Sequence, residues 1–387
     1  MGQNQPLGLS EEENKERTRR KRPRYDSRNQ LAFDVLAEFG VAASHAITDI
    51  MGEKQAEALV RTEWQNASLA STLNIKNRMA FEGHDYLFLA YAVNFANYIM
   101  GLDQKGETTS NGGRWSATSC PWSRATNAIC CHLDFVPKSL AEVFAPAYTP
   151  LNPKRLSRGD DECLVIMVKE GIDPEQVLEA PCIYEPLPPL LDLEEMVLWN
   201  HSYFGGMWAV LMKSIVNEIG PEMPMNSLGP KFNDIGKEFA NRFKEEYHVS
   251  IDNLDSVANG LFSFHSSFLK NGRMERNSDE FTIITHECPY SGEPPEMCQL
   301  FQCFYDGLLE EINPELIMSN SMMMSKGDKT CHWTIRKKEE AVREKAKEEA
   351  STDDPAKILA VRYARGELSE EEFDKKMASL RKHGLIK

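Results

Sequence analysis

The chain carries the stretch HECPYSGEPPEMC at residues 286–298, followed by GDKTC at residues 327–331, and a related pair of stretches lies earlier. The earlier pair reads TSCPWSRATNAIC at residues 118–130 and GDDEC at residues 159–163. Three cysteine pairs share one spacing, because 288 − 120, 298 − 130 and 331 − 163 all equal 168. A repeat without gaps at this spacing predicts an internal duplication, in which two homologous modules adopt one scaffold.

The residues around each set of cysteines predict an α+β fold. Each repeat begins with apolar residues at helical spacing, over 31–50 in the first repeat and 196–219 in the second. The β-branched run 281–288 predicts a strand, and Pro294 and Pro295 favour a helix that continues to residue 312. Gly327 and Asp328 then predict a tight turn between two further strands. We therefore expect each module to contain N-terminal helices followed by β-α-β-β.

Composition divides the chain into six segments. The connector between the repeats is rich in proline, and residues 335–350 carry Glu and Lys at i,i+4 spacing, which predicts a charged helix. After it, Pro355, Gly366 and a capping box of Ser369 and Glu372 predict a helical hairpin. The expected segments are a disordered basic tail (1–29), the first module (30–175), a Pro-rich linker (176–194), the second module (195–338), a charged helical linker (339–352) and the helical hairpin (353–383).

The charge and hydropathy of the chain exclude several classes of partner. The net charge of −15 makes nucleic acid an improbable partner. The basic run RTRRKRPR at residues 17–24 has two interpretations, a solvated tail or a contact for an acidic partner. No apolar run reaches the roughly 18–20 residues of a membrane span, and the N-terminus has no secretory signal. We expect a cytoplasmic protein without membrane contact, whose nine cysteines are thiols.

Clustered thiols in a reducing compartment favour metal binding or catalysis over disulfides. In each repeat one cysteine ends a strand, one lies early in the next helix and one follows the turn, and such points can converge at one end of a sheet. Three thiolates suit zinc or another transition metal, although no CxxC pair is present. The alternative is that these cysteines fill the core. The candidate metal ligands are Cys120, Cys130 and Cys163 in the first repeat and Cys288, Cys298 and Cys331 in the second.

The second repeat has more acid–base groups near its thiols than the first. His286 stands two residues before Cys288, a spacing that places both side chains on one face of a strand. The first repeat has Thr118, Ser119 and Leu164 where the second has His286, Glu287 and His332. Each histidine alone has a simpler interpretation as a hydrogen-bonded structural residue, and an aspartate in a turn binds its own backbone. The candidate catalytic residues are His286, Glu287, Cys288, Asp328, Cys331 and His332.

The C-terminal segment contains ILAVRYARGELSEEEF at residues 358–373 and closely resembles the SHOCT (short C-terminal) domain. This resemblance covers essentially the whole hairpin. It implies that residues 353–383 serve in homo-oligomerisation or in attachment to a partner protein.

The second repeat, in its His286–Tyr290, Met297–Cys298, Asn313–Pro314 and Lys326–Cys331 stretches, resembles the L-2-amino-thiazoline-4-carboxylic acid hydrolase family. The first repeat resembles a diverged copy. The resemblance implies addition of water to a cyclic C=N group of a small-molecule substrate of amidine or thiazoline type. It places the site at Cys288, Cys298, Asp328 and Cys331, with the more competent copy in the second repeat. The alternative is a non-catalytic small-molecule-binding or accessory subunit, assembled through the hairpin.

Overall fold

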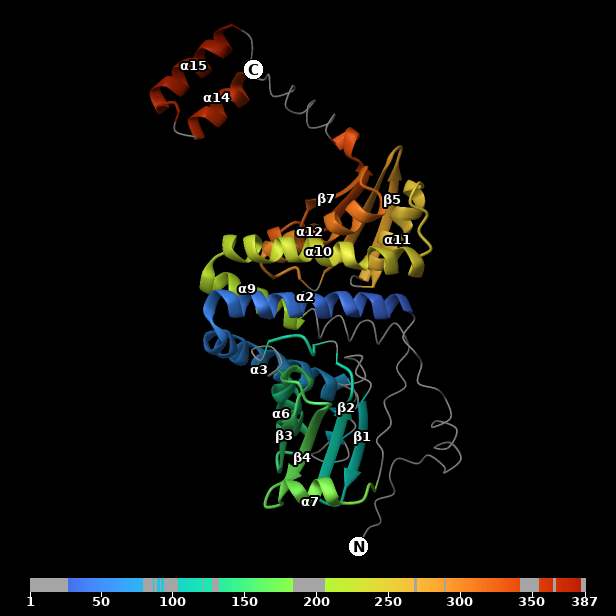
Figure 1. The fold of residues 1–387 in the computed structure, drawn as a ribbon. Coiled ribbons are helices and arrows are strands. Elements are labelled where there is room, and N and C mark those ends of the chain that lie inside the picture. The colour runs from blue at the N-terminus through green and yellow to red at the C-terminus, as the bar shows by residue number, and fades with distance from the viewer. Residues whose placement is uncertain are drawn as a thin grey trace.

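The structure is a computed structural model in which two halves of similar build lie on either side of a layer of helices (Figure 1). It describes residues 27–78, 86, 89–90, 92–93, 104–120, 122–126, 132–183, 206–267, 270–288, 290–341, 355–364 and 367–383. Within these residues no helix is both long and apolar enough to cross a membrane.

The first half contains helices followed by a four-stranded antiparallel sheet in the order β1-β2-β4-β3. Helix α6 of this half packs on β3 of the sheet. The elements of this half are α2 (Ser27–Met51), α3 (Glu53–Arg78), β1 (Gln104–Thr109), β2 (Gly112–Ala117), α6 (His132–Phe144), β3 (Tyr148–Lys154), η1 (Leu156–Arg158), β4 (Cys163–Lys169) and α7 (Pro174–Glu179).

The second half repeats this order, with a sheet β5-β6-β8-β7. Its last two strands and the short helix between them keep the spacing of the cysteines, because 316 − 148, 324 − 156 and 331 − 163 all equal 168. The elements of this half are α9 (Gly206–Ile219), α10 (Glu222–Glu246), α11 (Leu254–Ser266), β5 (Lys270–Asn277), β6 (Glu280–Glu287), α12 (Pro295–Ile312), β7 (Leu316–Met322), η3 (Met324–Lys326) and β8 (Cys331–Lys337). The expected α+β class is therefore confirmed at the level of mixed helices and antiparallel strands.

The strand order differs from the expected β-α-β-β in one respect: an additional strand precedes it in each half. These strands, β1 and β5, lie at the edge of each sheet, where one side of the strand stays unpaired. Their sequences, QKGETT and KNGRMERN, are polar and charged, and neither contains valine, isoleucine or an aromatic residue. Edge strands commonly carry charged side chains, which prevent pairing with other chains. For this reason the hydrophobic pattern of the sequence did not predict β1 and β5.

The predicted start of the charged helix, at residue 335, was also wrong. Residues 335–337 belong to β8, and Ile335 pairs with Phe281 on the buried face of the sheet. Burial of this apolar side chain outweighs the helical charge spacing that follows it. The remaining residues of the charged linker after 341, the basic tail up to residue 26 and the linker residues 184–194 lie outside the described residues.

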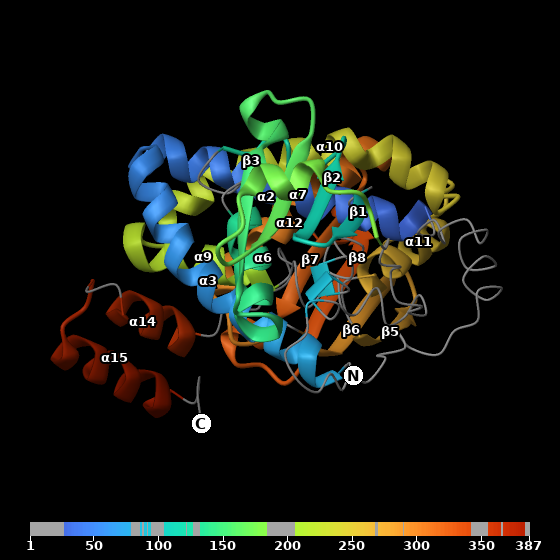
Figure 2. The ribbon, with the colours of Figure 1, turned by 90° about the horizontal axis from the view of Figure 1, so that it is seen from below.

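The first helix of each half packs on the other half. Helix α2 lies along α10, and α9 packs on α3. Phe39 of α2 stacks on Phe232 of α10 with ring centroids 4.0 Å apart, and an Asp34–Arg242 ion pair of 2.7 Å joins the same helices. Residues more than 190 positions apart therefore form a single core (Figures 1 and 2).

Helices α10 and α12 cross in close contact because each has a glycine at the crossing. A Cβ atom on Gly236 would lie 2.1 Å from the backbone oxygen of Phe304. A Cβ atom on Gly307 would lie 1.9 Å from the backbone oxygen of Asn233. This contact fixes α12, which contributes several side chains to the candidate site.

The two C-terminal helices, α14 (Pro355–Ala364) and α15 (Glu370–Lys382), pack on each other beside the main body (Figure 2). The rings of Tyr363 and Phe373 stack at 4.8 Å. The predicted capping box is present, since Ser369 Oγ accepts from Glu372 N–H and the Glu372 carboxylate accepts from Ser369 N–H.

Candidate thiol site

The candidate site lies on the helix-covered face of the second sheet. Cys331 and Trp333 alternate with outward-facing residues along β8, so both point to the buried face. Directly opposite them on β6 lie Thr285 and Ile283. Because β6 and β8 are the two central strands of the sheet, this part of the site has a rigid base.

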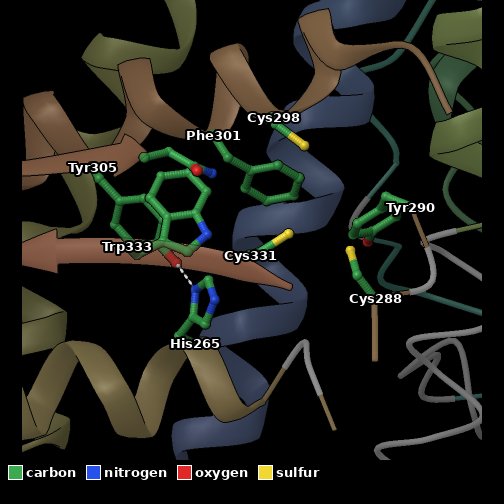
Figure 3. Close-up of a pocket in the computed structure, with 9 residues that line it drawn as sticks. His265, Cys288, Tyr290, Cys298, Phe301, Tyr305, Cys331 and Trp333 are labelled. Atoms are coloured by element: carbon green, nitrogen blue, oxygen red, sulfur yellow. Dashed lines mark hydrogen bonds between the residues drawn. The ribbon is translucent and has the colours of Figure 1, made fainter. Parts of the chain in front are cut away.

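The other two thiols reach the same place from different elements. Strand β6 ends at Glu287, and a turn closed by a hydrogen bond from Ser291 N–H to Cys288 O (3.1 Å) brings Cys288 inward. Cys298 lies in the first turns of α12, and a hydrogen bond of 3.3 Å joins its Sγ to Ser325 Oγ. Figure 3 shows the side chains of Cys288, Cys298 and Cys331 around one space. In the second half, the three thiols therefore converge on one cavity, as the positions of the cysteines in the sequence suggested.

The space between the thiols is a cavity of about 30 Å³. A cavity of this volume has room for at least one water molecule. Its lining is mainly aromatic and sulfur-containing, which makes it a low-dielectric site. The lining residues are His265, Cys288, Tyr290, Cys298, Phe301, Tyr305, Asn320, Cys331 and Trp333.

The pKa values of Cys288 and Cys331 shift in opposite directions. The neighbouring thiol of Cys288 is the largest influence on Cys331 and lowers its pKa to about 7. Burial opposes this shift, and a hydrogen bond from Met324 N–H to Cys331 Sγ (3.2 Å) supports it. The neighbouring Cys331 and burial raise the pKa of Cys288, so Cys331 is the more acidic of the two thiols.

The pKa of the third thiol is raised. Burial is the largest influence on Cys298, while its hydrogen bond to Ser325 works in the opposite direction.

A buried histidine–tyrosine pair forms another wall of the cavity. His265 of α11 and Tyr305 of α12 are joined by a hydrogen bond of 2.9 Å between Nδ1 and Oη (Figure 3). Both rings also contact the indole of Trp333, with centroids 5.7 and 5.4 Å away. Neither residue was among the candidates taken from the sequence. Burial raises the pKa of Tyr305, so its hydroxyl stays protonated and forms a fixed polar pair with His265 next to the thiols.

Asn320 of β7 brings a polar group to this lining that no described residue satisfies. Its amide nitrogen and oxygen are both buried, and neither has a hydrogen-bond partner among the described residues. The corresponding residue of the first half is Asn152, since 320 − 168 = 152. With its amide oriented toward its neighbours, Asn152 donates to the backbone oxygens of Lys154 and Leu164 at 2.7 and 2.8 Å. A buried amide without partners has a strong tendency to bind a polar ligand.

The structure does not bring the predicted proton carriers to the cavity. His286 is exposed and accepts a hydrogen bond from the Arg273 guanidinium on the edge strand. Glu287 lies at the exposed end of β6. His332 points to the opposite sheet face from Cys331 and forms a 3.0 Å hydrogen bond with Thr330. The expectation that His286 and Cys288 share a face was wrong, because the strand ends between them and the chain turns.

Asp328 has the position of a turn residue. Its carboxylate accepts from Met323 N–H (2.7 Å), and its own N–H donates to Met323 O (3.2 Å). Gly327 before it adopts a left-handed conformation with φ of 94°. Asp160 closes the corresponding loop of the first half through Arg155 N–H (2.6 Å). The structure thus supports the interpretation of this aspartate as a loop-closing residue that holds Met324 N–H against Cys331.

The first half keeps part of this arrangement. Cys163 Sγ accepts from Leu156 N–H at 3.3 Å, as Cys331 does from Met324. Cys120 precedes a turn of the same form as that after Cys288. Cys130 lies outside the described residues, so the third position of this half is not placed. Pro137 and Val165 occupy the positions of Tyr305 and Trp333, so this half lacks these two aromatic rings.

Among the described residues, no group of three or more His, Cys, Asp or Glu side chains is arranged to hold a metal ion. Chemically, the three cysteines of the second half are soft ligands of the kind that zinc or copper(I) prefers. Zinc binding would require their sulfur atoms to move into tetrahedral positions.

Comparisons of the chain with models of protein families, with curated proteins and with solved structures found no match.

Proposed function

We propose that the second half is a thiol-dependent hydrolase acting on a small cyclic C–N substrate of the amidine or thiazoline type. The observation that supports this proposal best is the position of Cys331, whose sulfur accepts a hydrogen bond from Met324 N–H and lines one cavity with Cys288. These two neighbours bring the pKa of Cys331 to about 7, so that a large fraction of this cysteine is thiolate at neutral pH. A thiolate is a strong nucleophile for the electrophilic carbon of a C=N group.

Each neighbouring group has a role in this proposal. Cys331 attacks the carbon, the C=N π bond breaks, and the nitrogen takes a proton from the hydrogen-bonded pair of His265 and Tyr305. Water then takes the place of the Cys331 sulfur on this carbon, so that the C–S bond breaks, the thiolate is restored and a proton of the water returns to the pair. Asn320 offers a donor and an acceptor side by side, which suits a substrate nitrogen and its proton. A ring is larger than a cavity of about 30 Å³, so its binding requires the lining side chains to move apart.

We also propose that the two halves derive from one duplicated module. The common strand bounds and the matching loops around Cys163 and Cys331 support this descent.

Binding of zinc or another transition metal by Cys288, Cys298 and Cys331 is the alternative use of the thiols. Elemental analysis of protein purified without oxygen distinguishes the two uses, since a stoichiometric metal would replace the nucleophilic thiolate.

Turnover of a thiazoline and of a cyclic amidine by purified variants tests the proposal. Cys331→Ser should abolish turnover, and Tyr305→Phe should lower kcat by about 10²–10⁴-fold through loss of proton transfer. Cys303→Ser is the matched control, because Cys303 lies on α12 outside the cavity lining. Circular dichroism would show that each variant is folded. Undiminished turnover by folded Cys331→Ser would contradict the proposal.

A further inference from the structure

The amide of Asn320 differs from that of its counterpart in the first half, although the two strands have the same irregularity. The pairing of β7 with β8 shifts register next to Asn320, and the pairing of β3 with β4 shifts around Asn152. Asn152 donates there to the backbone oxygens of Lys154 and Leu164. Both amide atoms of Asn320 are buried and make no hydrogen bond to a described residue. The irregular strand alone therefore does not explain why the amide of Asn320 lacks partners.

The hydrogen-bonding pattern of this amide defines the charge of a ligand that would satisfy it. The nitrogen of Asn320 donates and its oxygen accepts, and a buried amide that lacks both bonds destabilises the protein. An ammonium group only donates and a carboxylate only accepts, so either ion would leave one amide atom unpaired. The complementary ligand is therefore neutral and carries an acceptor and a donor side by side.

The cavity that Asn320 lines defines the size and shape of this ligand. Its volume of about 30 Å³ has room for about two groups of the size of water, at about 10–15 Å³ for each. Asn320 is the strand neighbour of Trp333, whose indole lies 5.4 Å from the ring of Tyr305. A small planar group can pack against these rings while its edge meets the amide of Asn320.

We propose that this cavity binds a compact neutral carboxamide, and that Asn320 is the residue that recognises it. The carbonyl oxygen of the ligand accepts from Asn320 Nδ2, and the N–H of the ligand donates to Asn320 Oδ1, so that the two amides pair edge to edge. No thiol takes part in this recognition, and the binding does not depend on the proposed hydrolysis. The first half does not offer this site, because the amide of Asn152 is bonded to the backbone.

The first test compares acetamide with acetone on the unchanged full chain. The two compounds have nearly the same size and shape, but acetone has a methyl group in place of the amide N–H₂ group. Saturation-transfer NMR measures the binding of each compound. We expect acetamide to bind with a dissociation constant on the order of 1 mM, as befits so small a ligand. Acetone should bind about tenfold more weakly or less, because it leaves Asn320 Oδ1 unpaired. Binding of neither compound would show that this amide binds water only, and would overturn the proposal.

Matched variants of the two asparagines complete the test. Asn320→Leu should lose acetamide binding and keep or raise the urea midpoint of unfolding, because it removes a buried amide without partners. Asn152→Leu should keep acetamide binding and lower the urea midpoint, because two backbone oxygens lose their donor. Acetamide binding by folded Asn320→Leu, or an equal loss of stability in both variants, would overturn the proposal. Cys331→Ser should bind acetamide like the unchanged protein even if it has no turnover, so this proposal and the proposed hydrolysis fail separately.

Discussion

Asp328 acts on Cys331 in two opposing ways. Its carboxylate closes the loop by accepting from Met323 N–H, and this loop presents Met324 N–H to the Cys331 sulfur. Its negative charge also raises the pKa of Cys331. The first influence needs only an acceptor oxygen, whereas the second needs the charge. An amide in place of the carboxylate separates them.

We predict that Asp328→Asn lowers the pKa of Cys331 below its value of about 7. In the unchanged protein, alkylation of Cys331 by iodoacetamide should fall about tenfold per pH unit below this pKa and level off above it, because only the thiolate reacts. In the variant the whole profile should move to lower pH. The rate is followed by mass spectrometry of the peptide 330–336. Asp160→Asn is the control, and a profile that moves to higher pH would contradict the prediction.

At the residue scale, the sequence predicted the thiols but not their neighbours. The spacing of 168 residues marked Cys288, Cys298 and Cys331, and the structure brings them to one cavity. The sequence did not indicate that β6 ends before Cys288 or that His286 points away from the cavity. His265 and Tyr305 looked like ordinary residues of amphipathic helices. A comparison of the two repeats held a signal for Tyr305, since the first has Pro137 there.

At the element scale, the site depends on helices from both halves. Phe301 of the cavity wall contacts Phe39 of α2 edge to face, with centroids 5.5 Å apart. Phe39 also stacks on Phe232, so one side chain of the first half supports both α10 and α12. Apolar spacing predicted these helices, but it does not say which helix packs on which. The exchange of α2 and α9 between halves therefore had no signal in the sequence.

We predict that Phe39→Ala lowers the free energy of unfolding by about 3–5 kcal/mol, as expected for truncation of a buried ring. Because Phe301 loses its support, the rate of Cys331 alkylation should also change, although Phe39 lies in the other half. Urea unfolding and the same alkylation assay measure the two effects. Leu73→Ala is the control, since Leu73 is exposed on α3. A variant with lower stability but an identical alkylation profile would show that the halves are packed together without influence on the site.

The crossing of α10 and α12 allows a second prediction at this scale. Gly307→Ala should destabilise the protein by about 1–3 kcal/mol, because the added Cβ would lie 1.9 Å from Asn233 O and the helices must separate. Gly229→Ala on α10 is the matched control, since its Cβ would meet only Cys303 Sγ at an ordinary 3.5 Å. Alanine favours a helix over glycine by about 1 kcal/mol, so this control should be neutral or stabilising in urea unfolding. Equal effects of the two substitutions would contradict the packing argument.

At the scale of the whole molecule, the two sheets are arranged around a shared helical layer, and the C-terminal hairpin stands beside it (Figures 1 and 2). The two halves have a similar order of elements, and the first described helix of each half packs on the other half. In this respect the molecule resembles a dimer whose two subunits are joined into one chain. The described part of α15 has no buried residue, and Tyr363 on α14 remains 41% exposed. So small a pair of helices buries little apolar surface by itself, and docking on another surface would stabilise it.

We predict that residues 353–383 hold copies of this chain together. Protein ending at residue 352 should contain fewer chains per particle than the full-length protein, because the hairpin surface that includes Tyr363 is lost. Light scattering after size-exclusion chromatography measures the mass, and urea unfolding should give the same stability for both proteins if the hairpin adds nothing to the main body. Tyr363→Ser in the full chain is the finer test, since it removes an exposed ring while the capping box of α15 stays in place. An unchanged number of chains per particle in both variants would contradict self-association, and would instead leave the hairpin as a contact for a different protein.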